Sequence, residues 1–192
     1  MRKIIVFNWV SLDGFIAGAD GETVWFAWDQ EIEEYYKRIQ SNIETIIYGR
    51  KTYETMANYW PTDASTEEDT EIRNHMNSTK KIVFSTSLQQ ADWNNAELSP
   101  SIDEKEIARM KQQPGKDVII FGSSTIISAL QKHQLIDEYL LMVNPVVLGS
   151  GTPLFQNIAE GFKLKILDNK SFDSGAVLLH YQTENKSVNE TT

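Results

Sequence analysis

Short runs of apolar, often β-branched residues recur along the chain between polar segments. Such runs predict buried strands, and they cover residues 4–12, 45–48, 81–85, 117–121 and 139–147. Between residues 29 and 43, the apolar side chains Ile32, Tyr35, Tyr36 and Ile39 recur at intervals of three and four, which predicts an amphipathic helix. We predict further helices at 52–57, 103–112 and 125–132, and a terminal hairpin from 162–168 and 176–182.

The order of these elements predicts the fold class. Strands and helices alternate through the first two thirds of the chain, and strand follows strand after that. This order is typical of an α/β domain in which helices flank a mostly parallel sheet and antiparallel strands complete it. Because 192 residues is the usual size of one domain, we expect a single domain at 1–182 and a polar, flexible tail at 183–192.

Composition excludes several classes of protein. The chain has no cysteine, which rules out disulfides, thiolate catalysis, cysteine-ligated zinc and iron–sulfur clusters. Its three histidines are scattered without metal-ligand spacing, so we expect no metal site. A formal net charge of −9 argues against binding to duplex nucleic acid, which needs many cations to replace phosphate counterions.

The apolar run near the start of the chain resembles a signal peptide only superficially. Asn8 interrupts this run and Asp13 ends it, so it is too short for the apolar core of a signal peptide. No stretch approaches 18 continuous apolar residues, so we expect no membrane span and a cytoplasmic protein.

Three predicted strands end in small or hydroxylated residues that open a helix or turn. These segments are Gly49-Arg50-Lys51-Thr52, Ser85-Thr86-Ser87 and Gly122-Ser123-Ser124-Thr125. Ligands of open α/β sheets bind at the carboxyl ends of strands, where helix N-termini attract phosphates. Arg50 and Lys51 add positive charge that suits a nucleotide phosphate. The alternative is that these residues only cap helices and turns, because Ser, Thr and Gly also favour such positions.

Asp29 has two interpretations. It follows Trp25-Phe26-Ala27-Trp28 at the predicted start of the first helix. A carboxylate beside aromatic side chains could hydrogen-bond a heterocyclic substrate or relay a proton. Equally, an aspartate at this position is a favoured N-cap residue. Nucleophilic catalysis has little support, since no G-x-S-x-G elbow is present.

Four segments, taken together and in this order, resemble a known family. They are Val10–Ala17, the pair Asp20-Gly21 with Trp25, Gly49–Thr52 and Asn144–Phe155. The first three are similar to the dihydrofolate reductase superfamily. The last resembles the reductase domain of the bifunctional riboflavin-biosynthesis deaminase-reductase.

The resemblance implies a dihydrofolate reductase-like fold with about eight strands, and a site for NADPH. In that site the 2′-phosphate would meet Arg50, next to Gly49, Lys51 and Thr52, and the adenosine side would meet Ser85 and Thr86. The pyrophosphate would lie on the turn Gly122, Ser123, Ser124 and Thr125, and the loop over the nicotinamide would be Ile16, Ala17 and Gly18. Relatives are commonly homodimers, and the strand at 139–147 would suit such a contact.

The sequence departs from the family pattern in three respects. The paired glycines of the pyrophosphate turn are here Gly122-Ser123, whose peptide would be cis if it follows the folate reductases. Asp29 aligns with the folate reductases' acid only after a one-residue gap. The zinc-dependent deaminase half is absent, because that site needs cysteines.

The expected activity is therefore reduction alone. We expect an NADPH-dependent reductase that transfers hydride to a small heterocyclic or sugar-like carbonyl or imine, most like 5-amino-6-(5-phosphoribosylamino)uracil reductase, with Asp29 as the proton-relay group. One alternative is a dihydrofolate reductase. Another is a dimer that binds nucleotide without catalysis, and a third is an interaction module that binds neither nicotinamide cofactor.

Overall fold

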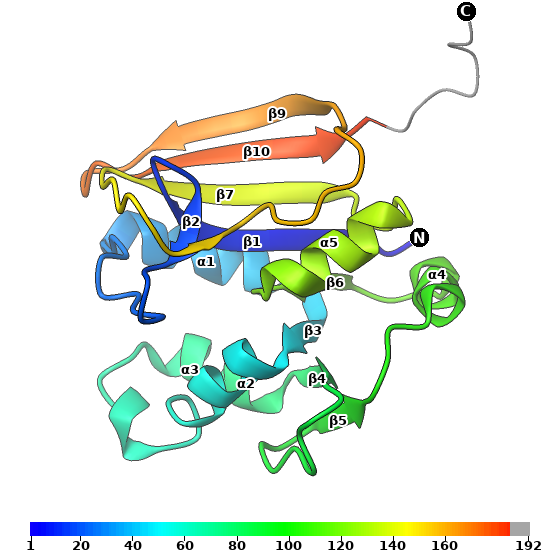
Figure 1. Ribbon diagram of the computed structural model, residues 1–192. Coiled ribbons are helices and arrows are strands. Elements are labelled where there is room, and N and C mark those ends of the chain that lie inside the picture. Colours follow the sequence, from blue (N-terminus) through cyan, green and yellow to red (C-terminus); the bar gives the residue numbers. More distant parts are fainter. Residues whose placement is uncertain (185–192) are drawn as a thin grey trace, which may run out of the picture.

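The structure is a computed structural model in which residues 1–184 are described, and its centre is one eight-stranded sheet (Figure 1). The strands of this sheet are β1 Ile4–Ser11, β3 Ile43–Gly49, β4 Lys80–Phe84, β5 Ala96–Ser99, β6 Asp117–Ile120, β7 Glu138–Asn144, β9 Leu164–Ser171 and β10 Val177–Thr183. A separate two-stranded sheet contains β2 Phe15–Ala17 and β8 Thr152–Pro153. The helices are α1 Gln30–Gln40, α2 Arg50–Ala57, α3 Thr70–Ser78, α4 Glu104–Gln112 and α5 Ser124–Lys132, with a 3₁₀ turn at Asp63–Ser65.

The strand order brings the predicted ligand-binding ends together. The order is β5-β4-β3-β6-β1-β7-β10-β9, and every neighbouring pair from β5 to β7 is parallel. Only β10 runs against its neighbours β7 and β9. The carboxyl ends of β1, β3, β4, β6 and β7 therefore meet at one edge of the sheet, as the alternating pattern predicts.

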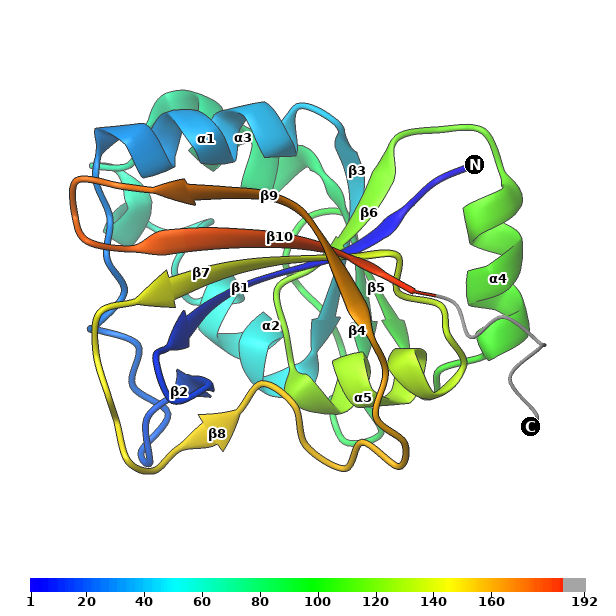
Figure 2. The same ribbon diagram turned by 90° about the horizontal axis from the view of Figure 1, so that it is seen from above.

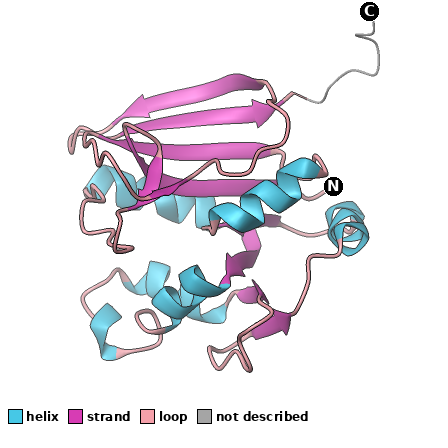
Figure 3. Cartoon of the chain, viewed as in Figure 1, coloured by secondary structure: helices cyan, strands magenta, loops and turns pink. Residues whose placement is uncertain are grey.

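Two hydrophobic clusters cover the two faces of the sheet. In β1, Ile5 and Phe7 face the cluster that includes α1 and α3, whereas Ile4 and Val6 face the cluster that includes α4 and α5. Figure 2 shows α1 and α3 on one side of the strands and α5 on the other, and Figure 3 shows the same layers by element type. Burial on both faces explains why β1 reads as an almost continuous apolar run.

Several element boundaries differ from the sequence-based predictions. The first helix ends at Gln40 rather than 43, because Ile43 already begins β3. Helix α3, which starts after its cap Asp69, and strand β5 were not predicted. The hairpin of β9 and β10 is confirmed, although Thr183 belongs to β10 and not to the tail. The rest of the predicted tail lies outside the described residues, except Glu184.

The strand predicted at 139–147, which was expected to suit a dimer contact, is mostly buried within the sheet. Strand β7 ends at Asn144 and lies between β1 and β10, so both of its edges are already paired. Tyr139, Leu140, Leu141 and Met142 are buried within the protein. The paired part of this strand is therefore not free for a dimer contact, and the expectation of a homodimer stays a prediction. Within residues 1–184, no helix combines the length and apolar character needed to cross a membrane.

Candidate functional site

Two helix N-termini lie side by side at the carboxyl ends of β3 and β6. The amide of Gly49 donates to the carbonyl of Gly122 at 3.2 Å, which joins the start of α2 to the turn before α5. Gly49 and Ser123 occupy the N-cap positions of these two helices, yet neither helix has a side-chain cap hydrogen bond. By contrast, aspartates cap α1, α3 and α4. The first amides of α2 and α5 thus remain available to an anion.

The backbones of the two turns approach each other closely. A Cβ on Gly49 would collide with the Oγ atom of Ser123, and a Cβ on Gly122 would lie 3.2 Å from the Oγ1 atom of Thr52. Gly122 has φ +115°, which favours glycine, and the Gly122-Ser123 peptide is cis, as the resemblance to folate reductases implies. These contacts bring together the Gly49–Thr52 and Gly122–Thr125 segments, which are far apart in the sequence.

The hydroxyl groups of the second turn are mostly engaged within the protein. The Oγ of Ser123 and the Oγ1 of Thr125 are 2.6 Å apart and share a hydrogen bond. Ser124 is buried, and its Oγ accepts a hydrogen bond of 2.7 Å from the side-chain Nε2 of Gln156. Ser124 therefore fixes the chain that follows β8, while Ser123 and Thr125 remain at the surface of the turn.

Asn8 supplies an unpaired acceptor beside these turns. Its Nδ2 atom donates to the carbonyl of Phe121 at 2.9 Å, and its side chain lies close to Gly122. The residue is only 6% exposed, and its Oδ1 has no hydrogen-bond partner among the described residues. Leaving a buried carbonyl unpaired costs free energy, so this atom suits a ligand donor such as a carboxamide. Sequence analysis missed Asn8, although a lone polar residue inside an apolar strand was a usable signal.

Arg50 lies in the first turn of α2. Its Nη1 atom pairs with both carboxylate oxygens of Glu54 at 3.0 and 2.9 Å, and its side chain is 40% exposed. Neither contact uses Nη2, which leaves part of the guanidinium fork for another anion. Lys51 is exposed next to it.

Ser85 and Thr86 follow β4, which pairs with β3 at the same edge of the sheet. The Oγ of Ser85 accepts hydrogen bonds from the amides of Ser87 and Leu88 at 3.2 and 2.9 Å. Ser85 therefore stabilises its own turn, whereas Thr86 is exposed. Because Phe84 is the register partner of Gly49, the structure brings Ser85 and Thr86 to the same edge of the sheet as the Gly49 turn.

The loop with Ile16, Ala17 and Gly18 packs against the segment after β7. Strand β2 pairs with β8, and a Cβ on Gly151 would collide with the carbonyl of Ala17. Two segments that carried the sequence resemblance, Val10–Ala17 and Asn144–Phe155, are therefore in contact. Their meeting point lies where β1 and β7 end (Figure 1).

Asp13 ties these two segments together. Its carboxylate accepts from the Oγ of Ser11 at 2.7 Å and from the amides of Gly149 and Leu148 at 2.8 and 3.2 Å. The Ser11 hydrogen bond, supported by the two amides, lowers the pKa of the Asp13 carboxyl. Asp13 thus holds the loop after β1 against the loop after β7.

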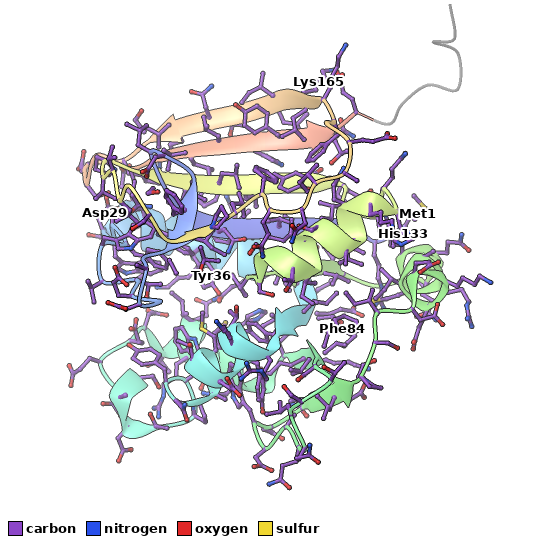
Figure 4. The ribbon with its side chains drawn as sticks, in the orientation of Figure 1. Met1, Asp29, Tyr36, Phe84, His133 and Lys165 are labelled. Carbon is purple, nitrogen blue, oxygen red and sulfur yellow. The ribbon has the colours of Figure 1, made fainter. Side chains whose placement is uncertain are left out.

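Asp29 is the N-cap of α1. One carboxylate oxygen accepts from the amide of Ile32 at 2.8 Å, and the other accepts from the amide of Ser174 at 2.9 Å. Burial raises the pKa of the Asp29 carboxyl, but the hydrogen bonds from Ile32 and Ser174 outweigh burial, and the pKa is lowered. Figure 4 shows Asp29 at the end of the molecule away from Met1 and His133. The capping interpretation of Asp29 is confirmed, and its proton-relay role stays a prediction.

Aromatic side chains line the start of α1 and the end of β1. The ring of Trp9 lies 5.6 Å from that of Phe26 and 5.8 Å from that of Trp28, between ring centroids. Trp28 also makes an edge contact with Tyr36, and Tyr36 contacts Phe121. Trp28 is 44% exposed, so part of this aromatic cluster (Trp9, Phe26, Trp28, Tyr36 and Phe121) is open to a ligand. The sequence placed Phe26 and Trp28 beside Asp29 but did not reveal their contacts with Trp9 and Tyr36.

Asn144 fixes the segment that carries Trp28. Its Oδ1 accepts from the amide of Ala27 at 2.7 Å, while its Nδ2 donates to the carbonyls of Met142 and Val10 at 2.9 and 3.2 Å. Asn144 is fully buried, and all three bonds hold backbone groups from separate segments. The indole Nε1 of Trp9 also donates to the carbonyl of Ala27, at 3.2 Å.

Comparisons with known proteins identify the family of this chain. Residues 2–178 match the family model of the RibD C-terminal domain. The chain is 34% identical to the uncharacterized protein YyaP of Bacillus subtilis (strain 168) over 180 residues, which are 94% of each chain.

Solved structures show the same fold. A putative riboflavin biosynthesis protein from Shewanella sp. PV-4 matches with a TM-score of 0.77 at 18% identity, over 96% of this chain and all of that one. A dihydrofolate reductase from Enterococcus faecalis, solved with NADP(H), matches with a TM-score of 0.63 at 16% identity, over 95% and 97%. The fold is dihydrofolate reductase-like, and the chain belongs to the RibD C-terminal domain family.

Proposed function

We propose that this protein is a reductase that binds NADPH across the N-termini of α2 and α5 and transfers hydride to a small heterocyclic or sugar-like carbonyl or imine. The observation that carries the proposal is that these two adjacent N-termini lack side-chain caps, whereas α1, α3 and α4 have them. Free amides and the helix dipole attract phosphate groups. The interpretation of the glycine and serine residues as simple caps does not explain this difference.

The residues of this region fit NADPH in three respects. Gly49, which has no side chain, and the hydroxyls of Ser123 and Thr125 lie at the two helix N-termini, where a pyrophosphate would bind. Arg50 keeps guanidinium donors for a 2′-phosphate while Glu54 orients its Nη1. Asn8 offers the unpaired Oδ1 to a carboxamide. NADPH itself would supply the hydride, and no residue of the chain needs to form a covalent bond to substrate.

The protein's contribution to the reaction is then positioning and protection from water. The small β2–β8 sheet holds Ile16, Ala17 and Gly18 beside the carboxyl end of β1, where they can cover the reacting groups. Asp29 stays ionised at neutral pH, because its pKa is lowered despite its burial. It therefore acts as an acceptor that orients a water molecule or a substrate N–H, through which a proton passes, rather than as a stored acid.

The proposal is tested by NADPH binding and by NADPH oxidation at 340 nm with purified protein. The substrates would be 5-amino-6-(5-phosphoribosylamino)uracil, its unphosphorylated form and dihydrofolate. Gly49→Ala fills the space against Ser123, and Gly161→Ala is the matched control because no atom lies within 4 Å of its Cβ position. We expect Gly49→Ala to weaken NADPH binding at least about tenfold, and Gly161→Ala to leave it unchanged.

Other outcomes would contradict the proposal in distinguishable ways. Tight NADPH binding without turnover of any substrate indicates a nucleotide-binding protein without catalysis. Failure to bind either nicotinamide cofactor indicates an interaction module. Turnover of dihydrofolate alone indicates a dihydrofolate reductase.

We also propose, from the family resemblance, a homodimer located in the cytoplasm. Sedimentation equilibrium of the purified chain tests the dimer, and a monomer at all concentrations contradicts it.

A further inference from the structure

The two segments beside the substrate end of the proposed site contain no lysine or arginine. Residues 4–36 include β1, β2 and the first half of α1, and residues 134–162 include β7 and β8. Neither range has a basic side chain of this kind, although the whole chain has 18. The acidic residues of 4–36 are Asp13, Asp20, Glu22, Asp29, Glu31, Glu33 and Glu34. Asp137 and Glu138 lie at the opposite end of β7, where they pair with Lys111 and Lys3, and they do not face this end of the site.

The fold joins these ranges into one wall, which we call the cation-free wall. Strands β1 and β7 pair over seven residues, from Ile5 with Glu138 to Ser11 with Asn144. Beyond the strands, the amide of Leu12 donates to the carbonyl of Val146 at 2.8 Å. Asn144 and Asp13 then hold the following loops together. The wall occupies the edge where β1 and β7 end, toward the left in Figure 1.

Two lysines on neighbouring elements pair with carboxylates. Lys170 of β9 lies 3.3 Å from Glu31 and over the ring of Phe172. Lys37, in the last turn of α1, lies 2.9 Å from Glu33 and 2.7 Å from Asp69. These pairs neutralise charge without leaving a net positive patch for a phosphate dianion.

The helix N-terminus on this wall is also occupied. Helix α1 begins here, and Asp29 accepts a hydrogen bond from the amide of Ile32 at 2.8 Å. A phosphate at this position would have to displace a carboxylate of the protein itself. In this respect α1 differs from α2 and α5, whose N-termini have no side-chain cap.

The cation-free wall exposes apolar side chains. Trp28 is partly exposed and packs against Trp9 and Tyr36 of the aromatic cluster. Leu12 and Val147 are 68% and 66% exposed on the two adjoining loops. Aromatic faces and edges of this kind pack well against a planar heterocycle.

We propose that the substrate bound by the cation-free wall is a planar heterocycle without a phosphate group, and that a phosphorylated ribosyl heterocycle is disfavoured. The inference rests on the proposed function, since it concerns the acceptor for the same hydride. It separates this chain's substrate from the phosphoribosylamino-pyrimidine that the family resemblance implied. The physical reason is that a phosphate dianion meets several carboxylates and no uncommitted cation or amide cluster on this wall.

A matched pair of ligands tests the inference without any cofactor. The probes are 5-amino-6-(ribosylamino)uracil and its 5′-phosphate, which differ only in the phosphate group, and the signal is quenching of tryptophan fluorescence. We expect the unphosphorylated compound to bind about tenfold more tightly at low salt. Raising the salt from about 0.02 M to about 0.3 M should narrow this gap, because screening weakens repulsion.

Two charge-reversal variants locate the effect. Asp20 is exposed on the loop between β2 and α1, whereas Asp92 lies on the loop between β4 and β5, away from the wall. We expect Asp20→Lys to strengthen binding of the phosphorylated compound about threefold or more, with the unphosphorylated compound unchanged. Asp92→Lys should change neither.

Three results would overturn the inference. They are tighter binding of the phosphorylated compound, an affinity for it that falls as salt rises, and absence of binding by either compound. NADPH binding is measured in a separate titration. If the protein did not bind NADPH, the proposed function would be contradicted, but the comparison of the two uracil compounds would still decide the substrate class.

Discussion

Removing the side chain of Asn144 should both destabilise the fold and release the segment that carries Trp28. Asn144 is fully buried and makes three hydrogen bonds, to the amide of Ala27 and to the carbonyls of Val10 and Met142, at 2.7, 3.2 and 2.9 Å. Each bond contributes about 1 kcal/mol net, and Asn144→Ala removes all three. We therefore expect the free energy of unfolding to fall by about 3 kcal/mol.

For a domain of this size, a loss of about 3 kcal/mol lowers the Tm by about 6 to 12 °C. Urea unfolding gives the free energy, and near-UV circular dichroism at low temperature reports the packing of Trp9 against Trp28. The near-UV signal should weaken even where the variant is fully folded by far-UV measurement. Asn74→Ala is the control, because Asn74 is exposed on α3.

The control should change the free energy of unfolding by less than about 0.5 kcal/mol. The reasoning about Asn144 is refuted if Asn144→Ala behaves like Asn74→Ala in stability and retains the full near-UV signal. A loss of stability with an unchanged near-UV signal would show that Asn144 stabilises the core without fixing the loop.

Three further outcomes follow from other parts of the structure. Burial lowers the pKa of His75 to about 4, so the unfolded chain takes up a proton before the folded chain does as the pH falls below about 6.5. The free energy of unfolding should therefore fall by about 2 to 3 kcal/mol between pH 6.5 and 4. Urea unfolding of His75→Gln should show no such fall over this pH range. Lys81 is buried and donates to the carbonyls of Asn77, Thr79 and Asn94 at 3.2, 2.7 and 3.1 Å. Lys81→Met should therefore lower the free energy of unfolding in urea by about 2 to 4 kcal/mol. The control Lys80→Met, at an exposed position, should lower it by less than about 0.5 kcal/mol. Trp28→Ala should weaken binding of the unphosphorylated uracil, detected by fluorescence, about fivefold to tenfold, while the affinity for NADPH stays within about twofold. Equal losses for both ligands would contradict the separation of the substrate subsite from the NADPH subsite.

Local patterns predicted the sheet, because its central strands are buried on both faces. Continuous apolar runs mark β1, β3, β6 and β7, and the turn from strand to helix follows each of β3 and β6. Strand β5 could not be found in this way. Its four residues, Ala96–Ser99, form a strand because they pair with β4, a contact that no local pattern records.

Helix α3 had a weaker signal that was present in the sequence. Ile72 and Met76 are four residues apart and both are buried, and Asp69 caps the helix at its start. The polar residues before it form a 3₁₀ turn, Asp63–Ser65, which is followed by the cap Asp69.

The candidate site depended partly on information that only the fold provides. The motif residues Gly49 and Ser123 were predicted, but their contact requires the adjacency of β3 and β6. A serine or glycine at the start of a helix does not reveal, from the sequence alone, whether a side chain caps the first backbone amides of that helix. The hydrogen bonds of Asn8 and Asn144 could not be predicted, because their partners, Phe121 and Ala27, are more than 100 residues away.

The central claim is that the N-termini of α2 and α5 bind a reduced dinucleotide whose 2′-phosphate meets Arg50. Equilibrium titration of wild type and Arg50→Ala with NADPH and with NADH tests it most directly, with quenching of protein fluorescence as the signal. The account predicts that Arg50→Ala weakens NADPH binding at least about tenfold, and NADH binding less than about threefold, because only NADPH carries the phosphate that the guanidinium pairs with. Equal losses for the two cofactors, or no binding of either by the wild type, would contradict it.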